Sequence, residues 1–281
     1  MEKPTPQTPI RRLGSFVLAT IAVALFGTWT HAAAADSLGK LVWVELITED
    51  AATAASFYEG LLDWKIEMRE SGRYTVLSNG KPIASISQIK NRLDEDEAQW
   101  LVGLEVEDLP ESVAAARRLG ATIHESAGSR AGFAQFAIIE DLEGAPVVFL
   151  DPEKPLGGER AAGAWVWAEL WTDDPVAASK FYGEVVGYER SETDLLGQAY
   201  PVFEIDGEPR AGMVEIEDKA VDPIWAPYLA VADVAATVRK AKSLGGRILL
   251  EPKPENRGGR VALLADPTGG AFFIYQIEAD S

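Results

Sequence analysis

The chain of 281 residues contains no cysteine, which excludes disulfide bridges, thiolate catalysis and a lipoprotein anchor. Histidine is nearly absent as well: His31 falls in the N-terminal segment, and His124 is the other occurrence. A metal site built on two imidazoles would therefore require two chains that each donate His124. Because His124 stands on a short β-type run beside Glu125, we interpret it as a surface or edge residue.

Basic residues are scarce, with 26 Lys and Arg against 44 Asp and Glu, so the formal net charge is −18 at pH 7. Such a chain is a poor partner for nucleic acid or an anionic membrane surface, and neither is predicted. We interpret the excess of acidic side chains as a source of solubility.

The N-terminal segment lacks charge over residues 13–30, directly after Arg11 and Arg12, and ends in the alanine run 32–35. This order predicts a secretory signal peptide over residues 1–35, cleaved within the alanine run. The expected location is periplasmic or secreted, by Sec export rather than the twin-arginine route. An uncleaved membrane anchor is the alternative, because the uncharged run is long enough to span a bilayer.

One stretch of sequence occurs twice. Residues 42–64 (VWVELITEDAATAASFYEGLLDW) and 166–188 (VWAELWTDDPVAASKFYGEVVGY) align without a gap. Each copy starts as a β-type run in which a Trp and a Glu stand two positions apart, so both side chains share one face of the strand. These residues are Trp43 and Glu45 in the first copy and Trp167 and Glu169 in the second.

An amphipathic helix follows in each copy. Asp50 and Asp174 suit the N-cap, and Pro175 suits the first helical position. Apolar residues then recur at helical spacing up to and beyond a Phe-Tyr pair. The repeated stretch therefore predicts a strand and a helix that packs back on the sheet.

The second half of the chain repeats the first, element by element. A β-α-β-β-β order occurs twice in each half, which predicts four such modules. We expect an α+β fold with cup-shaped mixed sheets and helices on the outer faces. The predicted boundaries are 37–152 for the first domain, 153–163 for a linker and 164–279 for the second domain.

The pattern W-x-E-L-x-T-x-D-x-x-A-A-x-x-F-Y, the Gly-x-Pro hairpin and the D-P-x-G ending that starts at Asp266 resemble the vicinal oxygen chelate superfamily. This superfamily includes glyoxalase I, the bleomycin-resistance proteins and the extradiol dioxygenases. The resemblance spans nearly all of both halves and implies two tandem glyoxalase/bleomycin-resistance-like domains. It leaves the function open, because members range from isomerases, lyases and dioxygenases to drug binders without catalysis.

In the metal-dependent members, the resemblance implies a divalent ion held by His, Glu or Gln on the first and last strands of two paired modules. None of the corresponding positions here carries a good ligand, so no cofactor is predicted. A Ca²⁺ or Mg²⁺ site made of oxygen ligands alone stays open. The positions are Trp43, Leu101, Trp167 and Ala226 on first strands, and Ala84 or Ser85, Val148, Ala211 or Gly212, and Phe273 on last strands.

The inner faces of the cups carry Glu45 and Glu169, and a half-buried carboxylate needs partners. One interpretation places these residues at the cup floors, as acceptors for a cationic or hydroxylated ligand or as a general base. The other is structural: each Glu pairs with an Arg or Lys and was inherited with the duplication.

Aromatic side chains on the expected strands form either the core or an aromatic wall for a ligand. The candidates for ligand binding are Trp43, Trp100, Trp167, Trp225, Tyr74 and Tyr228. Arg130 and Arg257 begin Gly-containing loops that could close over a ligand, but we interpret them as ordinary surface residues.

These observations predict an exported protein that binds a small organic molecule in an aromatic-walled cup without a transition metal. One alternative is a lyase-type or isomerase-type enzyme with Glu45 or Glu169 as the base. A second alternative is a structural or interaction protein with filled cups. Since each cup can form within one chain, we expect a monomer.

Overall fold

The structure is a computed structural model. The predicted signal peptide lies outside the residues that it describes. Within the described part, no helix has the length and apolar character needed to cross a membrane. The described residues are 37–70, 72–89, 98–130, 134–152, 161–195, 198–218, 221–254 and 256–277.

The first half of the chain contains two modules of one helix and four strands each. They comprise β1 (Leu41–Thr48), α1 (Ala51–Leu61), β2 (Lys65–Glu70), β3 (Arg73–Ser78), β4 (Lys81–Gln88), β5 (Gln99–Glu105), α2 (Leu109–Leu119), β6 (Thr122–Arg130), β7 (Ala134–Glu140) and β8 (Pro146–Pro152).

The second half repeats this order and adds a 3₁₀ turn. It comprises β9 (Trp165–Thr172), α3 (Pro175–Val186), β10 (Glu189–Leu195), β11 (Gln198–Ile205), β12 (Glu208–Glu215), β13 (Ile224–Val231), α4 (Val234–Ser243), β14 (Arg247–Leu250), η1 (Arg257–Gly259), β15 (Val261–Ala265) and β16 (Ala271–Gln276).

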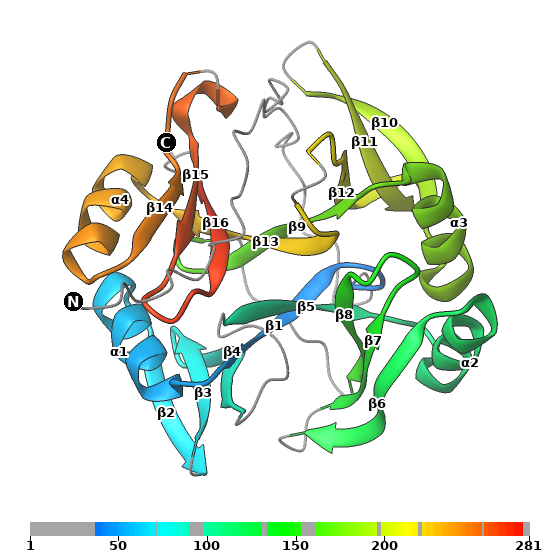
Figure 1. Cartoon of the computed structure of the whole chain (residues 1–281), viewed down its shortest axis with the longest axis horizontal. Helices are drawn as coiled ribbons and strands as arrows, with labels where there is room; N and C mark the ends of the chain where they lie inside the picture. Colours follow the sequence, from blue (N-terminus) through cyan, green and yellow to red (C-terminus); the bar gives the residue numbers. More distant parts are fainter. Residues whose placement is uncertain are drawn as a thin grey trace, which may run out of the picture.

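Each half folds into one eight-stranded mixed sheet (Figure 1). The strand orders are β2-β3-β4-β1-β5-β8-β7-β6 and β10-β11-β12-β9-β13-β16-β15-β14. The two central strands of each sheet run antiparallel, and each is flanked by a parallel partner from its own module. The predicted α+β fold of four βαβββ modules is therefore confirmed.

The helix starts follow the predicted capping residues. Asp50 accepts from the backbone N–H of Thr53 at 3.0 Å. Asp174 accepts from the N–H groups of Val176 and Ala177, each at 3.0 Å, with a proline at the start of the helix. These bonds satisfy donors that a helix start otherwise leaves without partners.

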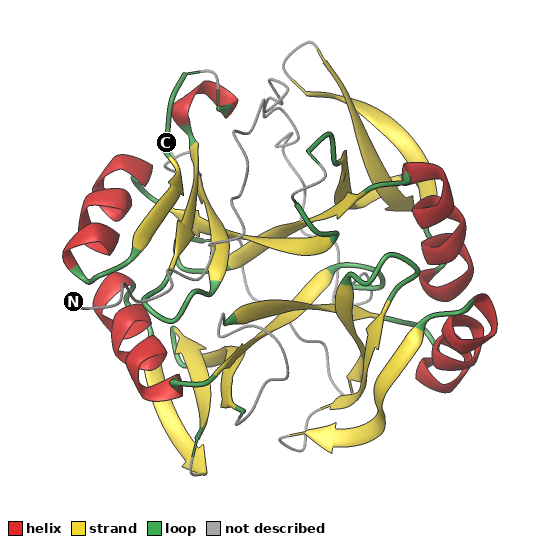
Figure 2. Ribbon diagram, in the orientation of Figure 1, coloured by secondary structure: helices red, strands yellow, loops and turns green. Residues whose placement is uncertain are grey.

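The helices pair across the two halves, α1 beside α4 and α2 beside α3, on opposite sides of the molecule (Figure 2). One apolar core combines the first module with the fourth, and a second core combines the two middle modules. The halves therefore share their cores.

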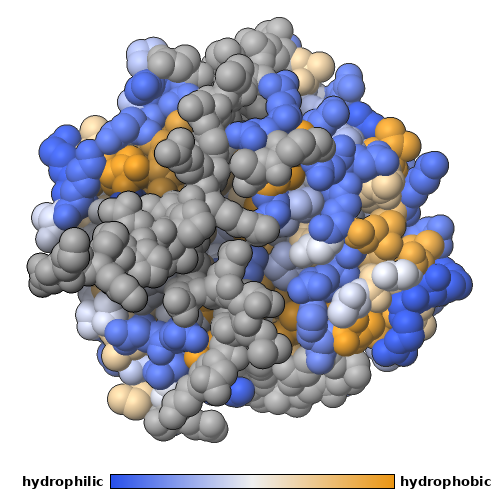
Figure 3. Space-filling view, viewed as in Figure 1, coloured by the Kyte–Doolittle hydropathy of each residue, from blue (hydrophilic) through white to orange (hydrophobic). Residues whose placement is uncertain are grey.

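On the face shown in Figure 3, hydrophilic side chains dominate the described surface, with apolar patches beside the α2 and α3 pair.

The Phe-Tyr pair of the repeated helix joins the halves through hydrogen bonds as well as packing. The Tyr58 hydroxyl donates to Asp266 Oδ2 at 2.9 Å, and Tyr182 donates to Asp141 Oδ2 at 2.9 Å. Each tyrosine oxygen also accepts from a tryptophan indole, as in the 2.8 Å bond from Trp100 to Tyr58. The aspartates belong to the D-x-x-G turns of the opposite half. The Phe-Tyr motif of one half therefore contacts the D-x-x-G turn of the other.

Candidate functional site

Each sheet has one face packed against helices, and we call the opposite face the cup. Trp100 and Trp225 lie on the helix side, where they are fully or almost fully buried and donate to Tyr58 and Tyr182. Tyr74 packs against the same core as α1. The structure therefore does not bring these three predicted ligand-binding residues to a cup, because neighbouring positions on a strand face opposite sides.

The first cup contains Trp43 and Glu45 on a mainly aliphatic surface. The Trp43 indole donates to Ser85 Oγ at 3.3 Å, and the Ser87 hydroxyl donates to Glu45 Oε1 at 2.7 Å. Glu45 is 5% exposed. The apolar residues packed with Trp43 are Val42, Leu101, Ala134, Phe136, Val148 and Leu150.

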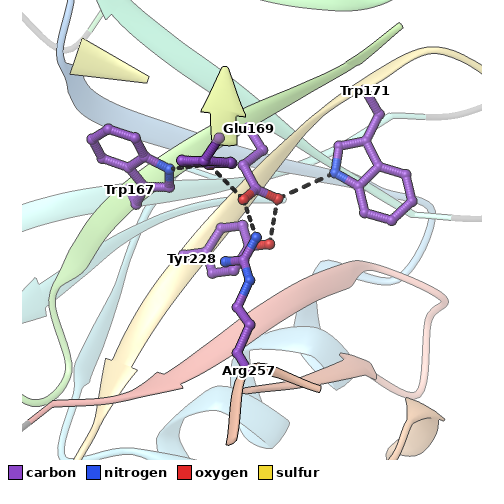
Figure 4. A network of polar contacts seen from close by, with 6 residues as sticks. Trp167, Glu169, Trp171, Tyr228 and Arg257 are labelled. Atoms are coloured by element: carbon purple, nitrogen blue, oxygen red, sulfur yellow. Dashed lines mark hydrogen bonds and ion pairs between the residues drawn. The ribbon is translucent and has the colours of Figure 1, made fainter. Parts of the chain in front are cut away.

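The second cup surrounds Glu169, whose side chain is completely buried. The Tyr200 hydroxyl donates to Oε1 at 2.7 Å, and Arg257 donates to the same oxygen. Tyr228 donates to Oε2 at 2.5 Å, and the Trp171 indole makes a longer contact of 3.4 Å (Figure 4). We call these five residues the Glu169 cluster.

Trp167 adjoins the cluster through Tyr200. Its indole donates to the Tyr200 hydroxyl at 3.0 Å, and its side chain remains partly exposed. The Tyr228 ring stacks on Phe273, with ring centroids 4.5 Å apart and planes 5° from parallel. Of the predicted site residues, the structure thus brings Trp167, Glu169 and Tyr228 together.

Arg257 is a residue whose role sequence reasoning missed. Its side chain is 12% exposed and forms an ion pair with Glu169, so its interpretation as an ordinary surface arginine is wrong. Asn256 fixes the loop through a 2.8 Å bond to the Glu251 carbonyl. A buried carboxylate requires a positively charged partner, so the sequence indicated that some cation lies near Glu169. Arg257 could not be identified as this cation, because it lies in an irregular loop, where residue spacing does not predict the direction of a side chain. The side chain of Arg130 lies outside the described residues.

Burial and charge shift the pKa values of Tyr200, Tyr228 and Arg257. Burial, together with the Glu169 charge, raises the pKa of Tyr200 well above its ordinary value. Burial likewise raises the pKa of Tyr228. For Arg257, burial disfavours the charge, but Glu169 and the two phenols outweigh it and raise the pKa. The phenols are therefore neutral donors, and the arginine is a permanent cation.

The two cups differ at positions that correspond in the duplication. Tyr228 lies opposite Phe273 in the second sheet, whereas Gly103 lies opposite Val148 in the first. A side chain at Gly103 has no room, because a Cβ there would lie 2.7 Å from a methyl group of Leu150. The first sheet therefore has no counterpart of the Tyr228 ring at this position.

The inner-strand positions do not fit the divalent metal that the superfamily resemblance implies. The residue beside Glu169 on the parallel strand is Gly212, and the residue beside Glu45 is Ser85. Both oxygens of Glu169 already accept hydrogen bonds, one of them from a guanidinium. Over the described ranges, no group of three or more His, Cys, Asp and Glu residues could hold a metal ion.

His124 has the environment predicted from the sequence. It lies on β6, the edge strand of its sheet, and its side chain is 47% exposed. Its partner is Glu140 at 3.0 Å. The interpretation of a surface or edge histidine is confirmed.

Comparisons with known proteins identify the relatives of this chain. A family model described as a glyoxalase-like domain matches twice, at residues 43–153 and 166–275. The anthracycline biosynthesis protein DnrV of Streptomyces peucetius is 31% identical over 260 residues, covering 85% of this chain and 94% of that protein. CFP32 of Mycobacterium tuberculosis, which is named as a glyoxylase, is 30% identical over 241 residues, covering 83% and 92%.

Solved structures share the fold at low sequence identity. The Mn(II)-bound glyoxalase from Novosphingobium aromaticivorans has a TM-score of 0.60 at 15% identity, covering 87% of this chain and 84% of that one. A single-residue variant of homoprotocatechuate 2,3-dioxygenase from Brevibacterium fuscum has a TM-score of 0.58 at 16% identity, covering 85% and 71%. With its two matching segments, the chain belongs to the glyoxalase-like domain family of the vicinal oxygen chelate superfamily.

Proposed function

We propose that the protein binds a small organic molecule in its second cup without a transition metal. The observation that carries this proposal is the Glu169 cluster, in which a completely buried carboxylate, two neutral phenols and an arginine meet on the face of the sheet opposite the helices. A few convergent polar groups among aromatic rings are typical of small-molecule sites. The first cup offers no comparable set among its described residues.

The aromatic surface of the second cup suits a flat ligand. Trp167 and the stacked pair of Tyr228 and Phe273 provide ring faces close to the polar cluster. Trp171 extends this surface, with its ring centroid 5.9 Å from that of Phe273. Ring stacking and burial of apolar area together supply affinity, while the cluster orients the ligand. The name of the Streptomyces relative, an anthracycline biosynthesis protein, agrees with a small organic ligand.

Binding fits the geometry of Glu169 better than general-base catalysis. Oε1 accepts from Tyr200 and Arg257, and Oε2 accepts from Tyr228 and, at 3.4 Å, from the Trp171 indole. A substrate proton could reach the carboxylate only after one of these donors left. The neutral phenols do not act as bases either, because burial raises the pKa of both.

An enzyme with Glu45 as base is the second candidate. Glu45 is buried and accepts from the Ser87 hydroxyl at 2.7 Å, and a relative carries the name of a glyoxylase. If this candidate is correct, Glu45→Gln abolishes turnover and leaves substrate binding nearly intact. Equal loss of binding and turnover would point to binding alone.

The proposed function is tested on protein that has been dialysed against EDTA. Ligand-observed NMR measures the binding of catechol, 1-naphthol, phenylacetate and benzamidine, which cover hydroxylated, neutral, anionic and cationic rings. We expect at least one probe to bind, to lose affinity in Trp167→Ala and to keep it in Trp43→Ala, the matching residue of the first cup. Absence of binding by all four, or binding that requires added metal, contradicts the proposal.

We also propose that the protein is exported and acts as a monomer. The support for export is the sequence order of residues 1–35 alone, and the support for a monomer is that both sheets form within one chain. Mass spectrometry of the secreted or periplasmic fraction tests cleavage near residue 35. Sedimentation equilibrium of the same sample tests the monomer, and a stable dimer contradicts it.

A further inference from the structure

The position of the Arg257 guanidinium in the second cup has the chemistry of a cation-binding site. We infer that Arg257 occupies this site in place of an external ligand, which carries a guanidinium or substituted ammonium group. This inference rests on the proposed function and specifies the class of ligand. Arg257 is in this view the internal substitute that neutralises Glu169 when the ligand is absent.

The geometry provides both elements of cation recognition. The guanidinium carbon lies 5.1 Å from the ring centroid of Tyr228 and 5.9 Å from that of Tyr200. The attraction of a cation to an aromatic face acts within about 6 Å of the centroid. The Glu169 carboxylate, completely buried, supplies the opposite charge at the same point. Two rings and a carboxylate around one position form an aromatic cage for a cation.

The backbone at Arg257 suggests that this side chain can leave the site and be replaced by a ligand. Arg257 belongs to the irregular turn η1 rather than to a strand, and its φ of +52° lies in the left-handed region, which non-glycine residues adopt at a cost. The two residues after it are glycines with φ of +66° and +79°, which permit a change of loop conformation. The side chain also retains contact with solvent, with 12% of its surface exposed.

Arg260, three residues later, shows how an arginine with a structural role is held in the same region. Its guanidinium donates to the backbone carbonyl of Gln276 at 2.7 Å and lies over the ring of Tyr275. Arg260 thus contacts a backbone carbonyl and a ring of one strand, β16, whereas Arg257 contacts side chains of three different strands. This difference makes Arg260 a matched control.

Charge favours a cation over an anion at this position. If an anionic ligand displaced Arg257, two negative charges would meet in a buried environment, which is strongly unfavourable. A neutral ligand that displaced Arg257 would leave Glu169 buried without a counter-charge. The formal net charge of −18 also raises the local concentration of cations around the protein.

The direct test is isothermal titration of methylguanidinium chloride, at constant ionic strength, into full-length Arg257→Ala and into wild type. With the internal arginine removed, methylguanidinium binds the variant roughly tenfold or more tightly than it binds wild type, and it raises the melting temperature of the variant. The double variant Arg257→Ala/Glu169→Gln loses this binding. Arg257→Gln, which retains a polar side chain, serves in the same titration if the alanine variant does not fold.

Two outcomes overturn the inference. One is methylguanidinium binding that is no stronger in either Arg257 variant than in Arg260→Ala; the other is binding that survives Glu169→Gln. If catechol, 1-naphthol or phenylacetate binds wild type in a Trp167-dependent manner while methylguanidinium binds neither Arg257 variant, the cation inference fails and the proposed function stands. If none of the aromatic probes binds, the proposed function itself fails.

Discussion

At the scale of single residues, the two cups differ in the side chains around their glutamates. Glu45 and Glu169 occupy equivalent places on β1 and β9, each two residues after a tryptophan. Glu169 accepts from two phenols and an arginine, whereas the position of the first sheet that corresponds to Tyr228 is occupied by Gly103. Both copies thus retain the glutamate, but the residues around it differ between the copies.

Arg257→Ala is predicted to destabilise the protein by about 3–5 kcal/mol, because it leaves a completely buried carboxylate without its counter-charge. Equilibrium urea unfolding measures this loss. Arg260→Ala is the control, with an expected loss of about 1–2 kcal/mol, since it removes a charged donor from a backbone carbonyl. Equal losses in the two variants would show that the ion pair with Glu169 contributes no more to the free energy of unfolding than the hydrogen bond of Arg260 does.

At the scale of elements, the absence of a side chain at Gly212 on β12 allows Tyr200 on β11 to reach Glu169. Gly212 on β12 lies opposite Glu169, and a Cβ at this glycine would lie 1.7 Å from the Tyr200 hydroxyl oxygen and 2.9 Å from Glu169 Cγ. The phenol thus fills the space that a side chain would take. The corresponding residue of the first sheet, Ser85 opposite Glu45, carries a side chain.

Gly212→Ala is predicted to displace Tyr200 and to cost about 1–3 kcal/mol through overpacking. Binding of the aromatic probes weakens as well, because Trp167 loses its hydrogen-bond partner. Urea unfolding and ligand-observed NMR measure the two effects. Ser85→Ala, at the equivalent position of the first cup, leaves probe binding unchanged; a similar loss of binding in both variants would contradict this role of Gly212.

Sequence reasoning predicted the elements well, since capping residues and alternation act locally. Asp50 and Asp174 cap the helices as expected. The sequence left Trp100 and Trp225 as either core residues or part of a ligand wall, and the structure places both on the helix side. Alternation could have indicated this side, because the neighbouring positions Leu101 and Ala226 were assigned to the cups. Tyr200 and Arg257 were missed because cross-strand register and an irregular loop bring them to Glu169.

At the scale of the whole molecule, the folding unit differs from the sequence repeat. The first module shares its core with the fourth, and the second shares its core with the third. Further bonds cross between the halves, including those from Tyr188 to the Gly39 carbonyl and from the Thr172 hydroxyl to the Glu143 carboxylate. The linear order of the modules gave no indication of this pairing, because it depends on contacts between residues far apart in the chain.

The shared cores predict one cooperative unfolding transition for the whole chain. Neither half can unfold without exposing the apolar side chains that the other half covers. Differential scanning calorimetry is expected to give a calorimetric enthalpy equal to the van't Hoff enthalpy. Two resolved transitions, each assignable to one half by truncation, would contradict the shared cores.

The aspartates between the halves predict a pH dependence of stability. Burial raises the pKa of Asp141 and Asp266 above the usual 3.8, although hydrogen bonds oppose the change. The folded state therefore holds these protons more tightly, and the resulting stabilisation is complete below pH 3.8 and is lost as pH rises through the raised pKa. Relative to Asp266→Asn, wild type loses free energy of unfolding over this window, as urea titrations at successive pH values measure. A difference that stays constant or changes in the opposite direction contradicts this assignment.

We propose that the second cup, with the Glu169 cluster, is the ligand site and binds its ligand without a metal. A crystal structure of EDTA-treated protein, soaked with the probe that binds most tightly in solution, tests this proposal. The predicted result is probe density against Trp167 and Tyr228, with Glu169 at the floor of the site. Density against Trp43 in the first cup, or a probe held by a metal ion, would contradict it.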